Sequence, residues 1–226
     1  MIKGYIIDMD GTLLDSMNIW ETAAITLLNN RGIIVSDDLK RILAPLSIKD
    51  AINYLKNKYC FNETVSEIQK QLFDLIEYQY LNEVSLKTGV REFINKCTIL
   101  NKKMCLLTAN KRNLTIKILN KHKLISYFDQ IITCDDTNLT KQDSDIYIYA
   151  MKKLNLNINE CIVIEDALHA INTAKKAGFI VWGVADRSNL NDWIKIKSIC
   201  DLAFKNMKFM KDKRETRNNS SNRKKK

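Results

Sequence analysis

The feature that most constrains this chain is a short apolar run, residues 4–7, that ends in an acidic turn containing Asp8 and Asp10. On extended backbone, side chains at i and i+2 point the same way, so both carboxylates face one pocket. Gly11 permits backbone angles closed to other residues, which lets the chain turn tightly against a bound phosphate. Thr12 supplies a hydroxyl and an amide at the same place. The turn therefore predicts a pair of reactive carboxylates beside an anion site.

Further apolar runs have the length of buried strands and alternate with amphipathic helical stretches. They are residues 104–107, 130–134, 161–164 and 179–184. This alternation predicts right-handed βαβ crossovers and a parallel sheet. Because sites in such sheets lie at the carboxyl ends of the strands, we expect the residues that follow the strands to share one crevice.

Polar residues that could carry chemistry follow three of these predicted strands. Thr108 follows the second strand, Lys141 lies beyond the third, and Glu165 and Asp166 follow the fourth. Taken singly, each of these residues is more typical of a structural role. A threonine such as Thr108 often caps a helix, a lysine such as Lys141 usually lies on a solvated surface, and acids such as Glu165 and Asp166 are common at the start of a helix. Their order after the acidic turn instead indicates a phosphoryl-transfer site assembled from strand ends.

In this order the segments resemble the four motifs of the haloacid dehalogenase superfamily of phosphohydrolases. The first motif, DxDGT followed by Leu or Val, matches Asp8 to Leu13, and the matches together span residues 4–185. The third motif places a lysine ahead of a helix start, as Lys141 stands here, although Gln142 and Ser144 replace the family's usual prolines. The resemblance implies an α/β fold, a Rossmann-like parallel sheet core with an inserted α-helical bundle cap, as in subfamily I.

Phosphoryl transfer needs an in-line nucleophile, neutralisation of charge on the phosphoryl oxygens and a proton for the leaving group. Asp8 is the predicted nucleophile that forms an aspartyl-phosphate, and an ordinary carboxyl pKa of about 4 would keep it ionised. Asp10 is the predicted acid that protonates the leaving oxygen and then activates water. For that role the pKa of Asp10 should lie above that of Asp8.

Two carboxylates beside a phosphate dianion also require a cation. Hard oxygen ligands without a nearby Cys or His cluster favour Mg²⁺. By resemblance to the family, the metal ligands are Asp8, the Asp10 carbonyl and Asp166, with Glu165 as a neighbouring or alternate ligand. The predicted phosphate-binding residues are Gly11, Thr12, Thr108, Ala109, Asn110 and Lys141.

A long stretch between the acidic turn and the second predicted strand, residues 16–86, has helical periodicity throughout. The predicted helices are 17–30, a short one after Ser36, one capped by Ser47, and 64–82. By resemblance this insertion is a cap of the C1 type, a lid over a core domain formed by residues 1–15 and 87–210. Its hinges would lie near residues 15–17 and 86–89. Cap residues that could contact substrate, although each is more typical of packing or surface, are Trp20, Lys40, Arg41, Ser47 and Lys49.

Composition limits the location and the partners. The six cysteines form neither a CxxC pair nor a disulfide framework, which favours reduced thiols in a cytoplasmic protein. No secretion signal is recognisable, and no apolar segment reaches the roughly 18 residues of a membrane span. Of the net charge of +10, residues 211–226 carry +6, with eight Lys or Arg against two acids. We expect this segment to be a disordered tail, with nucleic acid no partner beyond a loose polyanion contact through it.

These observations predict a magnesium-dependent phosphatase that hydrolyses a small phosphorylated metabolite, similar to the phosphoglycolate phosphatases. Within the resemblance, Asp10 argues against dehalogenases and phosphonate-cleaving enzymes, which lack it. One alternative is a sugar-phosphate mutase similar to β-phosphoglucomutase, which shares the helical cap. The other is a non-catalytic binding protein on the same fold, against which the intact motif residues argue.

Overall fold

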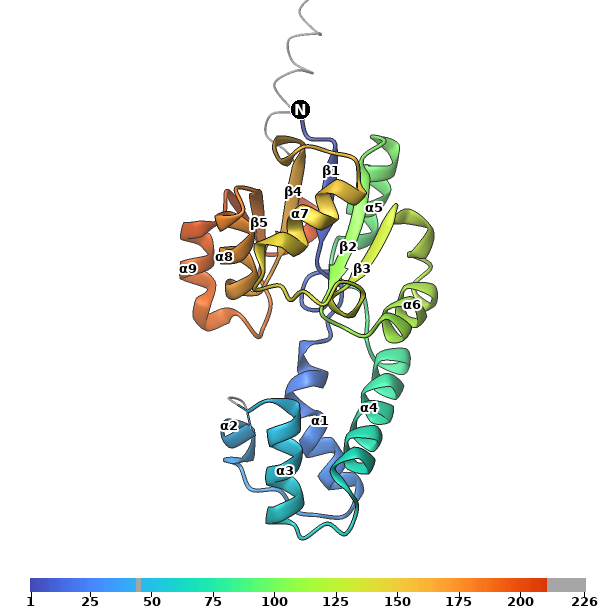
Figure 1. Ribbon diagram of the computed structural model, residues 1–226, viewed down its shortest axis with the longest axis vertical. Helices are drawn as coiled ribbons and strands as arrows, with labels where there is room; N and C mark the ends of the chain where they lie inside the picture. The colour runs from blue at the N-terminus through green and yellow to red at the C-terminus, as the bar shows by residue number, and fades with distance from the viewer. Residues whose placement is uncertain (44–45, 211–226) are drawn as a thin grey trace, which may run out of the picture.

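Six parallel strands form one sheet in the order β3-β2-β1-β4-β5-β6, in a computed structural model that describes residues 1–43 and 46–210 (Figure 1). The strands are β1 Gly4–Ile7, β2 Lys103–Thr108, β3 Gln130–Thr133, β4 Cys161–Glu165, β5 Ile180–Val184 and β6 Leu202–Phe204. The predicted parallel sheet is confirmed, with β6 as a sixth strand that the sequence did not predict. The basic segment 211–226 lies outside the described residues.

Both faces of the sheet are buried under helices. These helices are α5 Val90–Ile99, α6 Arg112–Lys121, α7 Ser144–Lys153, α8 Leu168–Lys176 and α9 Trp193–Ile199. In β1, Tyr5 and Ile7 pack in the cluster that contains the buried residues of α5 and α6. Ile6 points the other way and packs with the buried residues of α7, α8 and α9. Because successive side chains of a strand point to opposite faces of the sheet, an uninterrupted apolar strand contributes to the hydrophobic core on each face.

Residues between β1 and α5 form a separate group of helices that lies beyond the carboxyl end of β2 (Figure 1). They are α1 Met17–Asn30, α2 Leu39–Leu43, α3 Ile48–Lys58 and α4 Val65–Asn82. Ser47 caps α3 as predicted, and Thr64 and Glu67 form a capping box that starts α4. Helix α4 packs against both α1 and α3. None of the helices in the described part of the chain combines the length and apolar character that a membrane crossing requires.

Short 3₁₀ segments complete the chain between the longer elements. They are Ile125–Tyr127, Cys134–Asp136, Ile158–Glu160, Leu190–Asp192 and Met207–Phe209.

The two segments that connect the helical group to the sheet lie side by side. The Asp15 amide donates to the Ser85 carbonyl at 3.0 Å, and the Lys87 amide donates to the Leu13 carbonyl at 2.9 Å. These hydrogen bonds join the two connecting segments at the places where the sequence predicts hinges. Any displacement of the helical group must therefore act on both connecting segments together.

Lys87 fastens the second connecting segment to the sheet edge. Its ammonium donates to the Gly11 carbonyl at 2.5 Å, the Ala185 carbonyl at 2.8 Å and the Asp186 carboxylate at 2.6 Å. Burial raises the pKa of Asp186, but hydrogen bonds from Lys87 and Ser188 together lower it below its ordinary value. The bridge links the acidic turn, the connecting segment and the loop after β5.

We predict that Lys87→Met lowers the free energy of unfolding at pH 7 by about 3 kcal/mol, because it leaves a buried carboxylate without its cation. Urea denaturation measures the loss. Since the pKa of Asp186 is lowered in the folded state, its contribution is present above about pH 4 and disappears as the pH falls further. Lys3→Met, which removes a pair with Glu160 at the surface, is the control and should cost far less. Equal losses from the two variants would contradict a special role for Lys87.

Candidate active site

The predicted residues meet at the carboxyl end of the sheet because β1 lies between β2 and β4. Ile7 is aligned with Leu106 of β2 and with Ile164 of β4. Asp8 directly follows β1 and donates its amide to the Ile164 carbonyl at 3.0 Å. Thr108 is the last residue of β2. Parallel pairing thus carries residues from distant parts of the sequence to one level of the sheet.

Three buried carboxylates gather at this edge. Asp8, Glu165 and Asp166 each offer an oxygen, and these oxygens all lie within 4.8 Å of one another. The three side chains are almost completely shielded from solvent. Such a concentration of negative charge is unfavourable without a compensating cation.

Lys141 supplies part of that compensation. Its buried ammonium donates to Asp8 Oδ1 and, at 2.9 Å, to Glu165 Oε2. Burial lowers the pKa of Lys141, but the facing carboxylates of Asp8 and Glu165 raise it well above its ordinary value, so the side chain stays charged. The second Asp8 oxygen, Oδ2, is buried and has no hydrogen-bond partner.

The acids themselves are strongly perturbed. Burial, and then the charge of Glu165, raise the pKa of Asp8 to about 6, although Lys141 opposes the shift. The expected ordinary pKa of about 4 is therefore wrong, because that expectation did not include the burial of Asp8 among other acids. Burial, Asp8 and Glu165 also raise the pKa of Asp166 well above its usual range.

The loop that carries Lys141 is held without the family's prolines. The Asp143 carboxylate accepts hydrogen bonds from the Thr140 amide and the Thr140 hydroxyl, both at 2.8 Å. Asp143 then precedes α7, which begins at Ser144. Side-chain hydrogen bonds to neighbouring backbone provide the local restraint that a proline ring gives elsewhere.

The acidic turn approaches Asp166 so closely that only glycine fits. Gly11 has a φ of +85°, and a Cβ there would lie 2.3 Å from Asp166 Oδ2. The next residue, Thr12, donates its hydroxyl to Asp166 Oδ1 at 2.9 Å. On the other side, Asn189 donates to the Asp166 carbonyl at 2.9 Å. Asp166 is thus fixed through both its side chain and its backbone, and the Asn189 contact was not predicted from the sequence.

Asp10 is not part of the cluster formed by Asp8, Glu165 and Asp166, and its own carboxylate accepts three hydrogen bonds. Ser16 Oγ donates to Oδ1 at 2.7 Å, Tyr80 Oη donates to Oδ1 at 2.5 Å, and Asn110 Nδ2 donates to Oδ2 at 3.2 Å. Burial and Asp8 raise the pKa of Asp10, while these three donors lower it, and the net change is upward. Ser16 occupies the N-cap position of α1 but makes no cap hydrogen bond, and sequence reasoning missed both it and Tyr80.

The residues predicted to bind phosphate occupy the same edge of the sheet, but some of their hydrogen-bonding groups already have partners within the protein. The Asn110 amide donates to Thr108 Oγ1 at 3.0 Å, and the Gly11 amide donates to the Leu14 carbonyl at 3.0 Å. Ala109, at the tip of this turn, is exposed. Lys141, which contacts Asp8, and Thr108, at the end of β2, remain the side chains at this edge that are suited to phosphoryl oxygens.

Among the five predicted cap contacts, Trp20 reaches the network around Asp10, because its indole nitrogen donates to Tyr80 Oη. Lys40 pairs with Glu21 at 2.5 Å, and Ser47 serves as the cap of α3. Arg41 and Lys49 are exposed.

The chemistry of this donor set fits a divalent cation. Three converging carboxylates carry more negative charge than Lys141 neutralises. Burial, with the charges of Asp8 and Glu165, accordingly raises the pKa of Asp166. All donors are hard oxygens, the kind that Mg²⁺ and similar ions prefer. The arrangement thus combines a cluster of carboxylates that could hold a metal with a separate carboxylate, Asp10, that has its own hydrogen-bond donors.

Known proteins resemble this chain in sequence and in fold. A phosphorylated carbohydrates phosphatase of Thermotoga maritima is 23% identical over 192 residues, which cover 84% of this chain and 88% of that protein. A phosphoglycolate phosphatase of Nitrosospira multiformis is 25% identical over 191 residues, with coverage of 81% and 83%. A solved Thermotoga maritima structure, provisionally named a β-phosphoglucomutase, superposes with a TM-score of 0.82 at 21% identity, covering 92% of this chain and 95% of that one. The haloacid dehalogenase-like hydrolase family matches residues 5–184, and the chain belongs to that family.

Proposed function

We propose that this protein is a magnesium-dependent phosphatase that hydrolyses a small phosphorylated metabolite through an aspartyl-phosphate on Asp8. The observation that carries the proposal is the state of Asp8, whose Oδ1 is held by Lys141 while its buried Oδ2 has no partner. The enzyme class, a phosphoric monoester hydrolase, is supported by relatives named as phosphatases in the same family.

In the first step, Asp8 Oδ2 forms a bond to phosphorus as the bond from phosphorus to the ester oxygen breaks. Asp10 gives its proton to the departing oxygen, so that an alcohol leaves rather than an alkoxide. The raised pKa of Asp10 is consistent with a side chain that can hold this proton before transfer. Lys141 fixes the rotation of the Asp8 carboxylate and thereby the direction of attack.

In the second step, a water oxygen attacks phosphorus and the bond to Asp8 Oδ2 breaks. Asp10, now ionised, accepts a proton from that water, which regenerates both carboxyl groups and releases inorganic phosphate. Thr108 and Lys141 would donate to the phosphoryl oxygens, and the turn residues Gly11 and Thr12, with Ala109 and Asn110, would surround them.

Asp8, the Asp10 carbonyl and Asp166 would hold the magnesium ion. When bound, the ion would neutralise charge on the phosphoryl oxygens and on the carboxylates around them. Glu165 is already engaged, because it accepts from Lys141 and from the amides of Asp166 and Ala167. This supports a role for Glu165 in orienting its neighbours rather than in binding the metal directly.

Residues 16–86 would form the cap that covers the reaction and excludes water. Their helices lie beyond the carboxyl end of β2, and their two connecting segments are paired. The relatives' names include phosphorylated carbohydrates and phosphoglycolate, which supports a phosphorylated sugar or small acid as substrate. None of the six cysteines, all of which lie in the described part of the chain, is joined in a disulfide, which supports a cytoplasmic location.

We predict magnesium-dependent phosphate release from at least one member of a panel of phosphorylated sugars, sugar acids and nucleotides. Asp8→Asn should reduce kcat by at least about a thousandfold, because the nucleophile is lost. Asp15→Asn changes an exposed acid in the adjoining segment and should retain activity. A purified Asp8→Asn protein with wild-type turnover would rule out Asp8 as the nucleophile.

The same panel separates hydrolysis from mutase chemistry when the phosphate is isotopically labelled. A phosphatase delivers the label as inorganic phosphate, whereas a mutase delivers it to another position of the sugar. We expect inorganic phosphate, and label retained on the sugar would favour the mutase.

A metal-binding prediction follows from the raised pKa of Asp8, about 6 in the metal-free protein. Since the unfolded carboxyl titrates near 4, this group stabilises the folded state below about pH 4 and loses that contribution as the pH rises through 6. Saturating Mg²⁺ should raise the melting temperature by about 5–10 °C at pH 7 and by less at pH 5. Asp166→Asn should weaken the response and Asp74→Asn, an exposed acid on α4, should not. A response equal at both pH values would contradict a site built on Asp8.

A further inference from the structure

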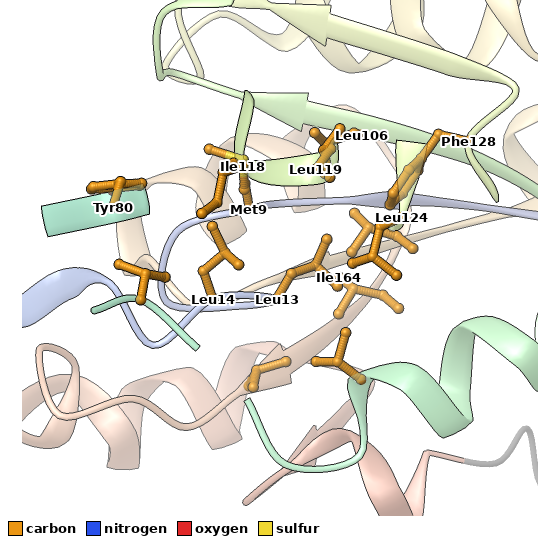
Figure 2. Packing of buried hydrophobic residues seen from close by; sticks show 14 of the residues in the cluster. Met9, Leu13, Leu14, Tyr80, Leu106, Ile118, Leu119, Leu124, Phe128 and Ile164 are labelled. Atoms are coloured by element: carbon orange, nitrogen blue, oxygen red, sulfur yellow. The ribbon is translucent and has the colours of Figure 1, made fainter. Parts of the chain in front are cut away.

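Tyr80 brings the helical group into direct contact with the predicted acid. It lies in the last turns of α4 and is completely buried. Its ring belongs to the same hydrophobic cluster as Met9, Leu14 and Ile118 (Figure 2). The last turn of α4 therefore packs against the acidic turn, and the Tyr80 hydroxyl is directed at Asp10.

The direction of the hydrogen bonds around Tyr80 follows from its partners. The indole of Trp20, from α1, can only donate, so the Tyr80 oxygen accepts from it. The Tyr80 hydroxyl proton is then left to donate to Asp10 Oδ1, at 2.5 Å. The two rings also meet edge to face, with centroids 6.0 Å apart and an angle of 72°. Trp20 thus holds Tyr80 in the orientation that serves Asp10.

The two carboxylate oxygens of Asp10 differ in the number and length of the hydrogen bonds that they accept. Oδ1 accepts from both Ser16, at 2.7 Å, and Tyr80. Oδ2 accepts one longer bond from Asn110, at 3.2 Å. Two short donors fix the rotation of the carboxyl group through Oδ1, which leaves Oδ2 as the oxygen able to exchange a proton with substrate or water.

Resting on the proposed phosphatase function, we propose that Tyr80 is a positioning residue that holds Asp10 through Oδ1 and so presents Oδ2 to the leaving oxygen. Ser16 lies at the start of α1 and Tyr80 near the end of α4, so both anchors come from the places where the helical group meets the sheet. The placement of the helices relative to the sheet then sets the orientation of the acid. A proton donor misplaced by about 1 Å loses much of its effect.

The experiment compares two esters that need a proton to different extents. One is the alkyl phosphate that the wild-type protein hydrolyses best in the panel above, whose alkoxide is a poor leaving group. The other is p-nitrophenyl phosphate, whose phenolate leaves readily without a proton. The quantity measured is kcat/KM, which reports the steps through formation of the phosphoenzyme.

Tyr80→Phe keeps the buried ring and removes only the hydroxyl. We expect kcat/KM for the alkyl ester to fall by about 10- to 100-fold, and that for p-nitrophenyl phosphate by less than about threefold. A purely structural role would lower both values alike. Equal losses on the two esters, or no loss on either, would overturn the proposal.

Matched variants isolate the hydrogen bonds. Tyr78→Phe makes the same change on an exposed tyrosine of α4 and should affect neither ester. Trp20→Phe removes the donor to Tyr80 and should produce a smaller loss confined to the alkyl ester. If Trp20 acts through Tyr80, the double variant should be no worse than Tyr80→Phe alone, and additive losses would contradict that order.

The outcome also distinguishes this proposal from the proposed function. A wild-type protein that releases phosphate from no ester in the panel would overturn the phosphatase assignment and the role of Tyr80 with it. An active wild-type protein whose Tyr80→Phe variant shows no selective loss would leave the phosphatase assignment intact and overturn the positioning role alone.

Discussion

The site is organised around one buried ammonium, that of Lys141, among three buried carboxylates. Lys141 contacts Asp8 and Glu165, and Asp166 lies within reach of both. Burial, and then the charges of the neighbouring acids, raise the pKa of Asp8 and of Asp166, and the single charge of Lys141 does not offset the rise. The imbalance favours a bound divalent cation and, in its presence, a phosphate group. Folding therefore places three acids and one lysine together in a buried cluster, and the proposed metal and substrate would complete its charge balance.

The surrounding framework keeps this cluster in place and holds Asp10, the proposed acid, through a different set of hydrogen bonds. Thr12 and Asn189 fix Asp166 from two sides, and Lys87 ties the acidic turn to the loop after β5. Asp10 is instead held by residues at the boundary of the helical group. The proposed nucleophile, Asp8, and the proposed acid, Asp10, are thus positioned by different parts of the fold, although they are two residues apart in the sequence.

Much of this could be predicted from the sequence because the informative patterns are local. Five strands were predicted to within one residue, and the strand rule placed Thr108, Lys141 and Asp166 at one edge of the sheet. Strand β6 was not predicted, because its three residues, Leu202–Phe204, are too few to show an alternation of apolar and polar side chains. The roles of Tyr80 and Lys87 were not predicted, because their partners, Asp10 and Gly11, are 70 and 76 residues away in the sequence. No local sequence pattern identifies a tyrosine that faces an acid. The raised pKa of Asp8 required knowledge of its neighbours.

The most direct measurement is mass spectrometry of the protein after a rapid acid quench during turnover of a labelled phosphate ester. A two-step mechanism through Asp8 predicts label on the peptide that contains Asp8, in a bond that hydroxylamine cleaves as it does other acyl phosphates. Label on a different peptide, or steady turnover with no labelled protein at any quench time, would contradict an aspartyl-phosphate on Asp8.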